Sequence, residues 1–322
     1  MKKACVLAAA AVVSFTPAMQ AAAQQWPDKP VRILVPFAPG GGTDIQARLL
    51  STAFQKSMGQ TFIVDNRTGA GGLIAGQIAV EAPPDGNTIL FTSGSISVVV
   101  TLYAKRMKFN IEQDLTPISW ISSTPLVLSV HPSVPARSVK ELIALAKSKP
   151  GVMNAGGNTA GSTAHLTAEM LNQVAGIKSQ VITYRGGGPA VVALISGEID
   201  YIFATAPSVM PHLKSGKAIP LAVTTPKRSS ALPDLPTMNT FYPGFESDNW
   251  YAMFFPKGTP KPIVDKMNAE IKKALDTPEI KAFFPREALD PVASSPEELS
   301  ALLKREIAKY AKVIKLANIR LE

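Results

Sequence analysis

Glycine-rich loops are the parts of this sequence best arranged for binding chemistry. The clearest spans residues 36–44 and contains Gly40, Gly41 and Gly42 in succession. Glycine lets backbone N–H groups approach a ligand closely, and the start of the helix expected after the loop adds unpaired donors and a partial positive charge. These groups favour a carboxylate, although the glycines would also suit a simple tight turn. We expect Thr43 to cap this helix, with Gln46 at its third position.

Two later loops repeat the arrangement. Residues 154–165 contain three glycines, and we expect Ser162 to cap the helix that follows. His165 falls at the third helical position, where it either reaches back towards the cap or contacts a ligand. Residues 184–189 again place glycines before a helix. Two such helix ends facing each other would suit a small dianion, and that convergence is a hypothesis.

Residue patterns for catalysis or metal binding are scarce. The three histidines, His131, His165 and His212, lack the close spacing with cysteine or carboxylates expected of a zinc site. No G-x-S-x-G, S-x-x-K or H-E-x-x-H motif occurs, and Ile45 stands where a dinucleotide fingerprint requires Gly or Ala. We therefore expect no metal, no cofactor and no enzymatic activity. The net charge of +9 favours encounter with anions, but no basic stripe interleaved with aromatics suggests nucleic-acid binding.

The N-terminus has the pattern of an export signal. Two lysines precede an apolar run over residues 4–15, and small residues follow near Ala23. A helix of that run rises only about 18 Å, too short to cross a bilayer core. We therefore predict that residues 1–23 are a cleaved signal peptide and that the protein is periplasmic. The only cysteine, Cys5, lies in this leader, so the mature chain has no thiol chemistry.

The remaining chain, about 300 residues long, alternates short apolar runs with helix-period segments, which is typical of α/β construction with largely parallel sheets. Strands are expected at residues 31–35, 62–64, 88–91, 126–130, 181–183, 199–203, 221–223 and 250–255. Helices are expected at residues 43–58, 72–81, 139–147, 162–174, 189–196, 260–275 and 296–316. Ser295 and Glu298 fit a capping box at the start of the last helix. We interpret Trp120, Trp250 and Tyr251 as core or hinge packing.

Several motifs occur in an order that resembles the Bug/TctC family, the solute receptors of tripartite tricarboxylate transporters. They cover essentially the whole mature chain and lie at residues 26–30, 35–44, 64–72, 82–86, 154–165, 184–189, 221–225, 231–237 and 258–262. The resemblance implies a type II periplasmic-binding-protein fold, with two α/β lobes of mixed, largely parallel sheets joined by two crossovers. Lobe 1 would comprise residues 25–121 plus 227–322, and lobe 2 residues 122–226, with the crossings as hinges.

The resemblance also implies where the ligand binds. The first two loops would grip a carboxylate, and residues after later strands would complete the cleft. The candidate ligand-binding residues are Phe37, Pro39, Gly40, Gly41, Thr43, Asp44, Ser93, Ser95, Thr159, Ser162, Thr163, His165, Tyr184 and Thr205. Asp44 would either accept a hydrogen bond from the ligand or serve the helix dipole.

One departure bears on the ligand. Many relatives carry an Asp-Asn pair after the position of Phe203, where this chain has Ala204 and Thr205. Loss of that carboxylate removes a partner for a ligand ammonium group, so we expect a small organic acid, a di- or tricarboxylate or an aromatic acid, in preference to an amino acid.

The resemblance implies that the protein captures this solute in the periplasm and delivers it to cognate membrane permease subunits. We expect a monomer that makes and breaks no bond. Two alternatives stay open from the sequence: a receptor that presents its ligand to a sensor kinase, and an enzyme on the same fold.

Overall fold

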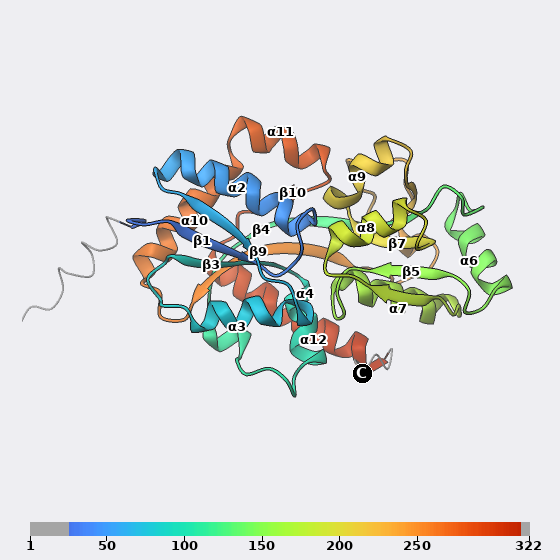
Figure 1. Cartoon of the computed structure of the whole chain (residues 1–322), viewed down its shortest axis with the longest axis horizontal. Helices are drawn as coiled ribbons and strands as arrows, with labels where there is room; N and C mark the ends of the chain where they lie inside the picture. The colour runs from blue at the N-terminus through green and yellow to red at the C-terminus, as the bar shows by residue number, and fades with distance from the viewer. Residues whose placement is uncertain (1–25, 317–322) are drawn as a thin grey trace, which may run out of the picture.

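The computed structural model describes residues 26–316, so the predicted signal peptide at residues 1–23 lies outside the described residues. The described strands form one continuous ten-stranded sheet in the order β2-β1-β3-β9-β4-β7-β5-β6, with β8 and β10 each paired to β4. Helices cover both faces of this sheet (Figure 1). None of the described helices is long and apolar enough to cross a membrane.

The sheet has two halves that share one long strand. The first half contains β1 (Val31–Val35), β2 (Phe62–Asn66), β3 (Thr88–Ser93), β9 (Asp248–Pro256) and β10 (Asp290–Pro291). The second half contains β5 (Asn154–Gly157), β6 (Gln180–Thr183), β7 (Tyr201–Thr205) and β8 (Ile219–Val223). The shared strand β4 (Leu115–Val130) pairs with β9 as far as Pro125 and with β7 from Leu126 onwards.

Pairing is parallel in the outer parts of the sheet and antiparallel around β4 and β9. β1 runs parallel to β2 and β3, and β5 runs parallel to β6 and β7. β9 is antiparallel to both β3 and β4. The carboxyl ends of β3, β5 and β7 point towards the middle of the molecule (Figure 1). Because a helix follows nearly every one of these strands, the N-termini of the helices lie together in the middle of the molecule.

Five helices follow strands β1, β3, β5, β6 and β7, either directly or after a short loop. They are α2 (Gly42–Met58), α4 (Ser95–Leu102), α7 (Thr163–Ala175), α8 (Gly187–Ile195) and α9 (Ala206–Lys214). The other helices form the outer layers: α3 (Leu73–Glu81), α5 (Ile111–Asp114), α6 (Val139–Ser148), α10 (Lys261–Leu275), α11 (Pro278–Arg286) and α12 (Pro296–Leu316). Short 3-10 turns lie at Ala70–Gly72 and Met238–Thr240.

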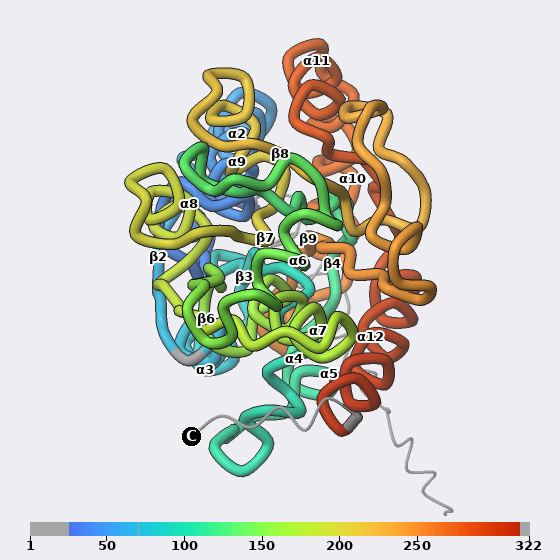
Figure 2. Tube along the Cα trace, turned by 90° about the vertical axis from the view of Figure 1, so that its right-hand side faces the viewer, coloured from blue at the N-terminus to red at the C-terminus, as the bar shows by residue number. Residues whose placement is uncertain are grey.

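Each half of the sheet has its own hydrophobic core. Phe54, Phe91 and Phe255 are fully buried in the first, where α2 and α10 pack on β1, β3 and β9. Tyr201 and Phe203 are fully buried in the second. A smaller cluster joins the halves, because Tyr310 of α12 packs with Val98 of α4 and Leu166 of α7, and Figure 2 shows α12 running beside these two helices. Burial of apolar surface in separate cores lets two bodies move relative to each other.

Most predicted elements are present, and the differences have physical causes. The strand at residues 31–35 and the helix at residues 296–316 have the predicted bounds. Ser295 and Glu298 form the predicted capping box, with mutual hydrogen bonds of 2.8 and 3.2 Å. Helices α4 and α9 were not predicted, because α4 is rich in β-branched residues and α9 contains two prolines, both features that disfavour helix.

Candidate ligand-binding site

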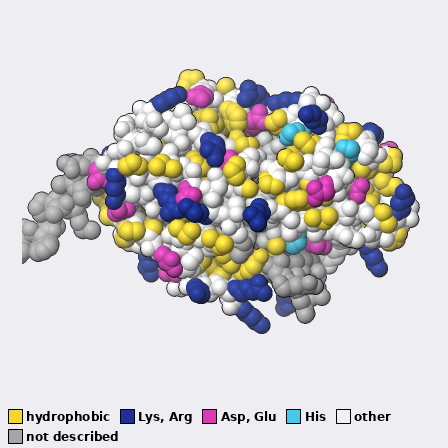
Figure 3. Space-filling model, in the orientation of Figure 1, with side chains coloured by type: hydrophobic (Ala, Val, Ile, Leu, Met, Phe, Trp, Pro, Cys, Tyr) yellow, Lys and Arg dark blue, Asp and Glu magenta, His cyan; other side chains and the backbone are white. Residues whose placement is uncertain are grey.

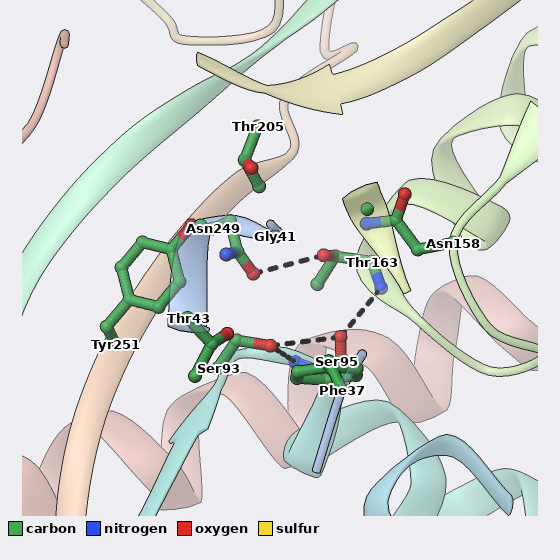
Figure 4. Close-up of a pocket in the computed structure, with 12 residues that line it drawn as sticks. Phe37, Gly41, Thr43, Ser93, Ser95, Asn158, Thr163, Thr205, Asn249 and Tyr251 are labelled. Carbon is green, nitrogen blue, oxygen red and sulfur yellow. Dashed lines mark hydrogen bonds between the residues drawn. The ribbon is translucent and has the colours of Figure 1, made fainter. Parts of the chain in front are cut away.

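A small cavity lies where the two halves of the sheet meet, at the carboxyl ends of the strands. Its volume is about 20 Å³, space for one or two water-sized groups. Its walls come from both halves, and Figure 4 shows their polar side chains pointing towards one another across it. The lining residues are Phe37, Gly41, Gly42, Thr43, Ser93, Ser95, Asn158, Thr163, Gly187, Thr205, Asn249 and Tyr251. We call this the inner cavity.

Five helix N-termini converge on the inner cavity. α2 contributes its cap Gly41 and its first residue Gly42, and α9 contributes its cap Thr205. The first residues of α4, α7 and α8 also line the cavity: Ser95, Thr163 and Gly187. N–H groups in a first helical turn have no helical acceptor, and each helix dipole adds partial positive charge.

The lining carries no formal charge of its own. All twelve residues are neutral, so positive potential in the inner cavity comes from backbone dipoles rather than from lysine or arginine. On the face drawn in Figure 3, Lys and Arg are spread out with Asp and Glu among them rather than gathered in one patch. Positive potential at the inner cavity therefore comes from the helix ends and not from the net charge of +9.

The start of α2 differs from the prediction. Its cap is Gly41, which makes no side-chain cap hydrogen bond, so the predicted Thr43 cap is wrong. The side chain of Gln46 instead donates to the Gly42 carbonyl and accepts from Ser122 at 2.6 Å. A glycine cap leaves the first N–H groups of α2 free of side-chain acceptors, which keeps them open to a ligand.

The Asp44 carboxylate holds the glycine loop in place through hydrogen bonds. Its buried carboxylate accepts hydrogen bonds of 3.0 Å each from the Gly40 backbone, from Arg48 and from Asn66. Burial acts to raise the pKa of Asp44, but these hydrogen bonds and the charge of Arg48 outweigh it and hold that pKa below its usual value. Asp44 is therefore an ionised anchor for the loop, and it does not itself line the inner cavity.

The second loop matches its prediction. Ser162 caps α7 by accepting from the His165 N–H at 3.1 Å, and the His165 ring accepts from the Gly161 N–H at 3.1 Å. Burial lowers the pKa of His165, which suits a neutral ring acting as an acceptor. The Thr163 N–H, at the start of α7, donates to the Ser95 hydroxyl at 3.2 Å and so connects α7 to α4 across the two halves of the sheet.

The first and third loops touch through their backbones. The Ala38 N–H donates to the Arg185 carbonyl at 3.0 Å. A side chain on Gly188 would collide with Pro39 and with Gly40, whose φ of 83° itself favours glycine. This close approach, possible only for glycines, brings the halves together over the inner cavity.

Strand β9 lines the inner cavity through two residues that the sequence analysis did not name as ligand-binding residues. Asn249 and Tyr251 lie two positions apart and so share one face of the strand. Asn249 accepts from the Thr163 hydroxyl at 3.1 Å (Figure 4). The Tyr251 hydroxyl is buried beside Gly42 and Thr205 and has no well-formed hydrogen bond among the described residues. Burial raises the pKa of Tyr251 to about 12, which keeps the phenol neutral and able to donate.

The predicted site residues divide into three groups. Seven line the inner cavity: Phe37, Gly41, Thr43, Ser93, Ser95, Thr163 and Thr205. Thr159 and Tyr184 line a neighbouring cavity. Five sit in the supporting loops: Pro39, Gly40, Asp44, Ser162 and His165. The lining residues not predicted are Gly42, Asn158, Gly187, Asn249 and Tyr251. No group of three or more metal-ligating side chains occurs among residues 26–316.

Residues 46–319 match the family model described as the tripartite tricarboxylate transporter family receptor, TctC. The chain belongs to the TctC family. It is 34% identical over 302 residues to BugT of Bordetella pertussis, an alignment that covers 93% of each protein. The resemblance found in the loop motifs is thus confirmed over nearly the whole chain.

Solved structures of TctC-like receptors have the same fold. BugD, a periplasmic binding protein, is 32% identical with a TM-score of 0.89 over 92% of this chain and all of its own. A Rhodopseudomonas palustris protein solved with adipate is 33% identical, with a TM-score of 0.88 over 92% and 99%. MatC from the same species, solved with malate, is 28% identical, with a TM-score of 0.85 over 90% and 100%. The predicted α/β periplasmic-binding-protein fold is therefore confirmed.

Proposed function

We propose that this TctC-family protein is a periplasmic receptor that binds a small carboxylate-bearing solute in the inner cavity. The observation that carries the proposal is the convergence of five helix N-termini on a small cavity without charged side chains. Such an arrangement stabilises a carboxylate through preorganised N–H donors and dipoles, at no cost of burying a second charge. The Tyr251 hydroxyl, buried without a well-formed partner, is a further donor for it.

The acid is expected to be an organic acid rather than an amino acid. No aspartate or glutamate lines the inner cavity, so an ammonium group there would have no counter-charge. Ala204, where many relatives are expected to carry an acid, is fully buried in the core and does not line the inner cavity, so this preference rests on the lining residues. The adipate and malate found with two relatives are both di-acids, which supports a di- or tricarboxylate; an aromatic acid stays compatible with the same donors.

Binding is proposed to close two lobes around the solute. The sequence-based lobes are residues 25–121 plus 227–322 and residues 122–226, and the switch of β4 pairing between Pro125 and Leu126 lies close to the first boundary. Met238 and Phe245 pack in the core of the second half, which favours a second crossing nearer to Asp248. Rotation about these two crossings would open the backbone contact between Ala38 and Arg185.

The role we propose is capture and delivery. The chain would be exported by the leader at residues 1–23, act as a monomer, and hand its solute to membrane permease subunits of the tripartite type. The inner cavity holds hydroxyls and amides but no histidine or carboxylate to act as a base. Binding without bond formation is therefore the function we propose, not catalysis.

A thermal-shift screen of the mature protein tests this function. The panel contains mono-, di- and tricarboxylates, aromatic acids, amino acids and sugars. At a hundred times its dissociation constant, a bound acid should stabilise the protein by about 2.7 kcal/mol. The primary amide of each responding acid is the matched control, because it keeps the shape but removes the charge, and it should produce little shift. If a sugar shifts the melting temperature while every acid leaves it unchanged, or if the amide of a responding acid shifts it as much as the acid does, the proposed function is wrong.

A further inference from the structure

Three buried hydroxyl side chains connect the segments that cross between the two halves of the sheet. They are Thr167 in α7, Thr224 directly after β8 and Ser247 directly before β9, and all three are fully buried. We call them the hinge hydroxyls. None of them lines the inner cavity, so none touches a solute held there.

Thr224 joins the two crossing segments. Its Oγ1 accepts from the Leu126 N–H at 3.0 Å, at the residue where β4 changes its pairing from β9 to β7. The same hydroxyl donates to the Ser247 carbonyl at 2.6 Å, and the Ser247 N–H donates back to the Thr224 carbonyl at 3.3 Å. One side chain therefore connects both of the proposed crossings.

Thr167 extends this connection to a helix that lines the inner cavity. Its hydroxyl donates its only hydrogen to the Thr163 carbonyl at 2.7 Å, so its oxygen accepts from Ser247 in the 2.6 Å contact between their hydroxyls. Thr163 is the first residue of α7 and lines the inner cavity. Its N–H donates to Ser95 and its hydroxyl donates to Asn249 (Figure 4). Hydrogen bonds thus lead without a break from the crossings to the cavity wall.

A small tilt of α7 at Thr167 would change the inner cavity. Thr163 lies four residues earlier, which is about 6 Å along the helix axis. A tilt of about 10° would therefore move the first residue of α7 by about 1 Å, enough to break a hydrogen bond. Because apolar groups of the same shape would replace the two hydroxyls at little cost in stability, the main consequence of the Thr167–Ser247 bond is the orientation that it imposes on α7.

We propose that Thr167 and Ser247 are positioning residues for solute binding, and that their hydrogen bond fixes the first N–H groups of α7 at the inner cavity. Atoms close to a rotation axis move little, so this bond persists when the proposed lobes open, whereas the distant contact between Ala38 and Arg185 breaks. This inference rests on the proposed function and assigns a role to two side chains that do not touch the solute.

Calorimetric titration of matched variants tests this role. The probe is whichever of acetate, malate, adipate, citrate and benzoate gives the largest thermal shift with the wild-type mature protein. The double variant Thr167→Val with Ser247→Ala removes both hydroxyls at nearly constant shape, so the melting temperature of the free protein should change little. Its affinity for the acid should fall about fivefold, the loss that corresponds to one hydrogen bond.

Two further variants separate positioning from packing. Thr167→Ser keeps the hydroxyl but removes a buried methyl group, so it should lower the melting temperature and leave the affinity for the acid close to that of the wild type. Ser129→Ala is the matched control, because Ser129 is a fully buried residue of β4 whose hydroxyl has no hydrogen-bond partner among the described residues. It should leave the affinity unchanged.

The outcomes separate this inference from the proposed function. If the double variant binds the acid as tightly as the wild type, the positioning role is wrong and the proposed receptor function stands. The same conclusion follows if Thr167→Ser weakens binding as much as Thr167→Val alone, a comparison that decides the question even if the double variant fails to fold. If none of the five acids binds the wild-type protein, the proposed function is wrong and this inference falls with it.

Discussion

At the scale of single residues, the proposed recognition of an anion depends on backbone N–H groups, and small lining side chains leave these groups accessible. Gly41 caps α2 without a side chain, and Asp44 holds the loop by accepting from Gly40, Arg48 and Asn66. The cation Arg48 does not line the inner cavity, and it acts on the site through Asp44 and Asn66. Preorganised N–H donors lose little entropy on binding, which favours affinity for a small solute.

Gly42 gives the sharpest test at this scale. A Cβ at Gly42 would collide with the Tyr251 hydroxyl and lie 2.9 Å from Thr205 Oγ1, so Gly42→Ala fills the inner cavity from its floor. We expect it to weaken acid binding at least tenfold, which is about 1.4 kcal/mol. Gly41→Ala is the matched variant, because the nearest atom to its Cβ would be Gly187 N at 3.4 Å, an ordinary contact, and the loss of affinity should be smaller. Calorimetry measures both, and a larger loss for Gly41→Ala would refute this geometry.

At the scale of secondary-structure elements, the sequence predicts the glycine loops and a strand at residues 250–255, but it does not predict that this strand completes the site. The loops were identifiable because glycines before a helix start carry a local signal, and half of the predicted site residues line the inner cavity. Asn249 and Tyr251 were missed because a strand that is buried along its whole length gives no sign of which face meets a ligand. Asn249 and Tyr251 reach the cavity because β9 pairs with β3 and β4, and such contacts between residues far apart in the sequence cannot be inferred from local patterns.

The start of β9 also contains an unusual acid. Burial raises the pKa of Asp248 to about 6; Lys309 opposes this rise, while Glu246, Glu306 and Asp290 reinforce it. The side chain lies where β9 begins, opposite the middle of β4, at the proposed crossing between lobes. Protonation of Asp248 is therefore linked to the stability of this junction.

The sign of that linkage can be measured. Because the folded-state pKa of Asp248 is above its usual value of 3.8, the folded chain holds a proton that the unfolded chain releases, and this contribution to stability is lost as the pH rises through about 6. Asp248→Asn should therefore stabilise the protein increasingly from about pH 4 to about pH 7.5, by about 1–2 kcal/mol in denaturant titrations. The exposed Asp234→Asn serves as the control. A gain that shrinks with rising pH would contradict the linkage.

At the scale of the whole molecule, two cores joined by β4 and β9 meet over one polar cavity. The halves touch through the Ala38–Arg185 backbone hydrogen bond, through the close approach of Gly188 to Gly40, and through the Thr163–Ser95 hydrogen bond. The halves also share the small apolar cluster of Tyr310, Val98 and Leu166, which is much smaller than the core of either half. An interface of this kind is compatible with the proposed movement of two lobes. A solute held by donors from both halves would add to these contacts and favour the closed arrangement.

The most direct test of this account is a crystal structure of the mature protein with the acid that gives the largest thermal shift. We predict a carboxylate oxygen in the inner cavity, within hydrogen-bond distance of backbone N–H groups of Gly42 or Thr43 and of the Tyr251 hydroxyl, directly or through one water. The contradicting result would be an acid bound elsewhere on the molecule while this cavity stays free of it.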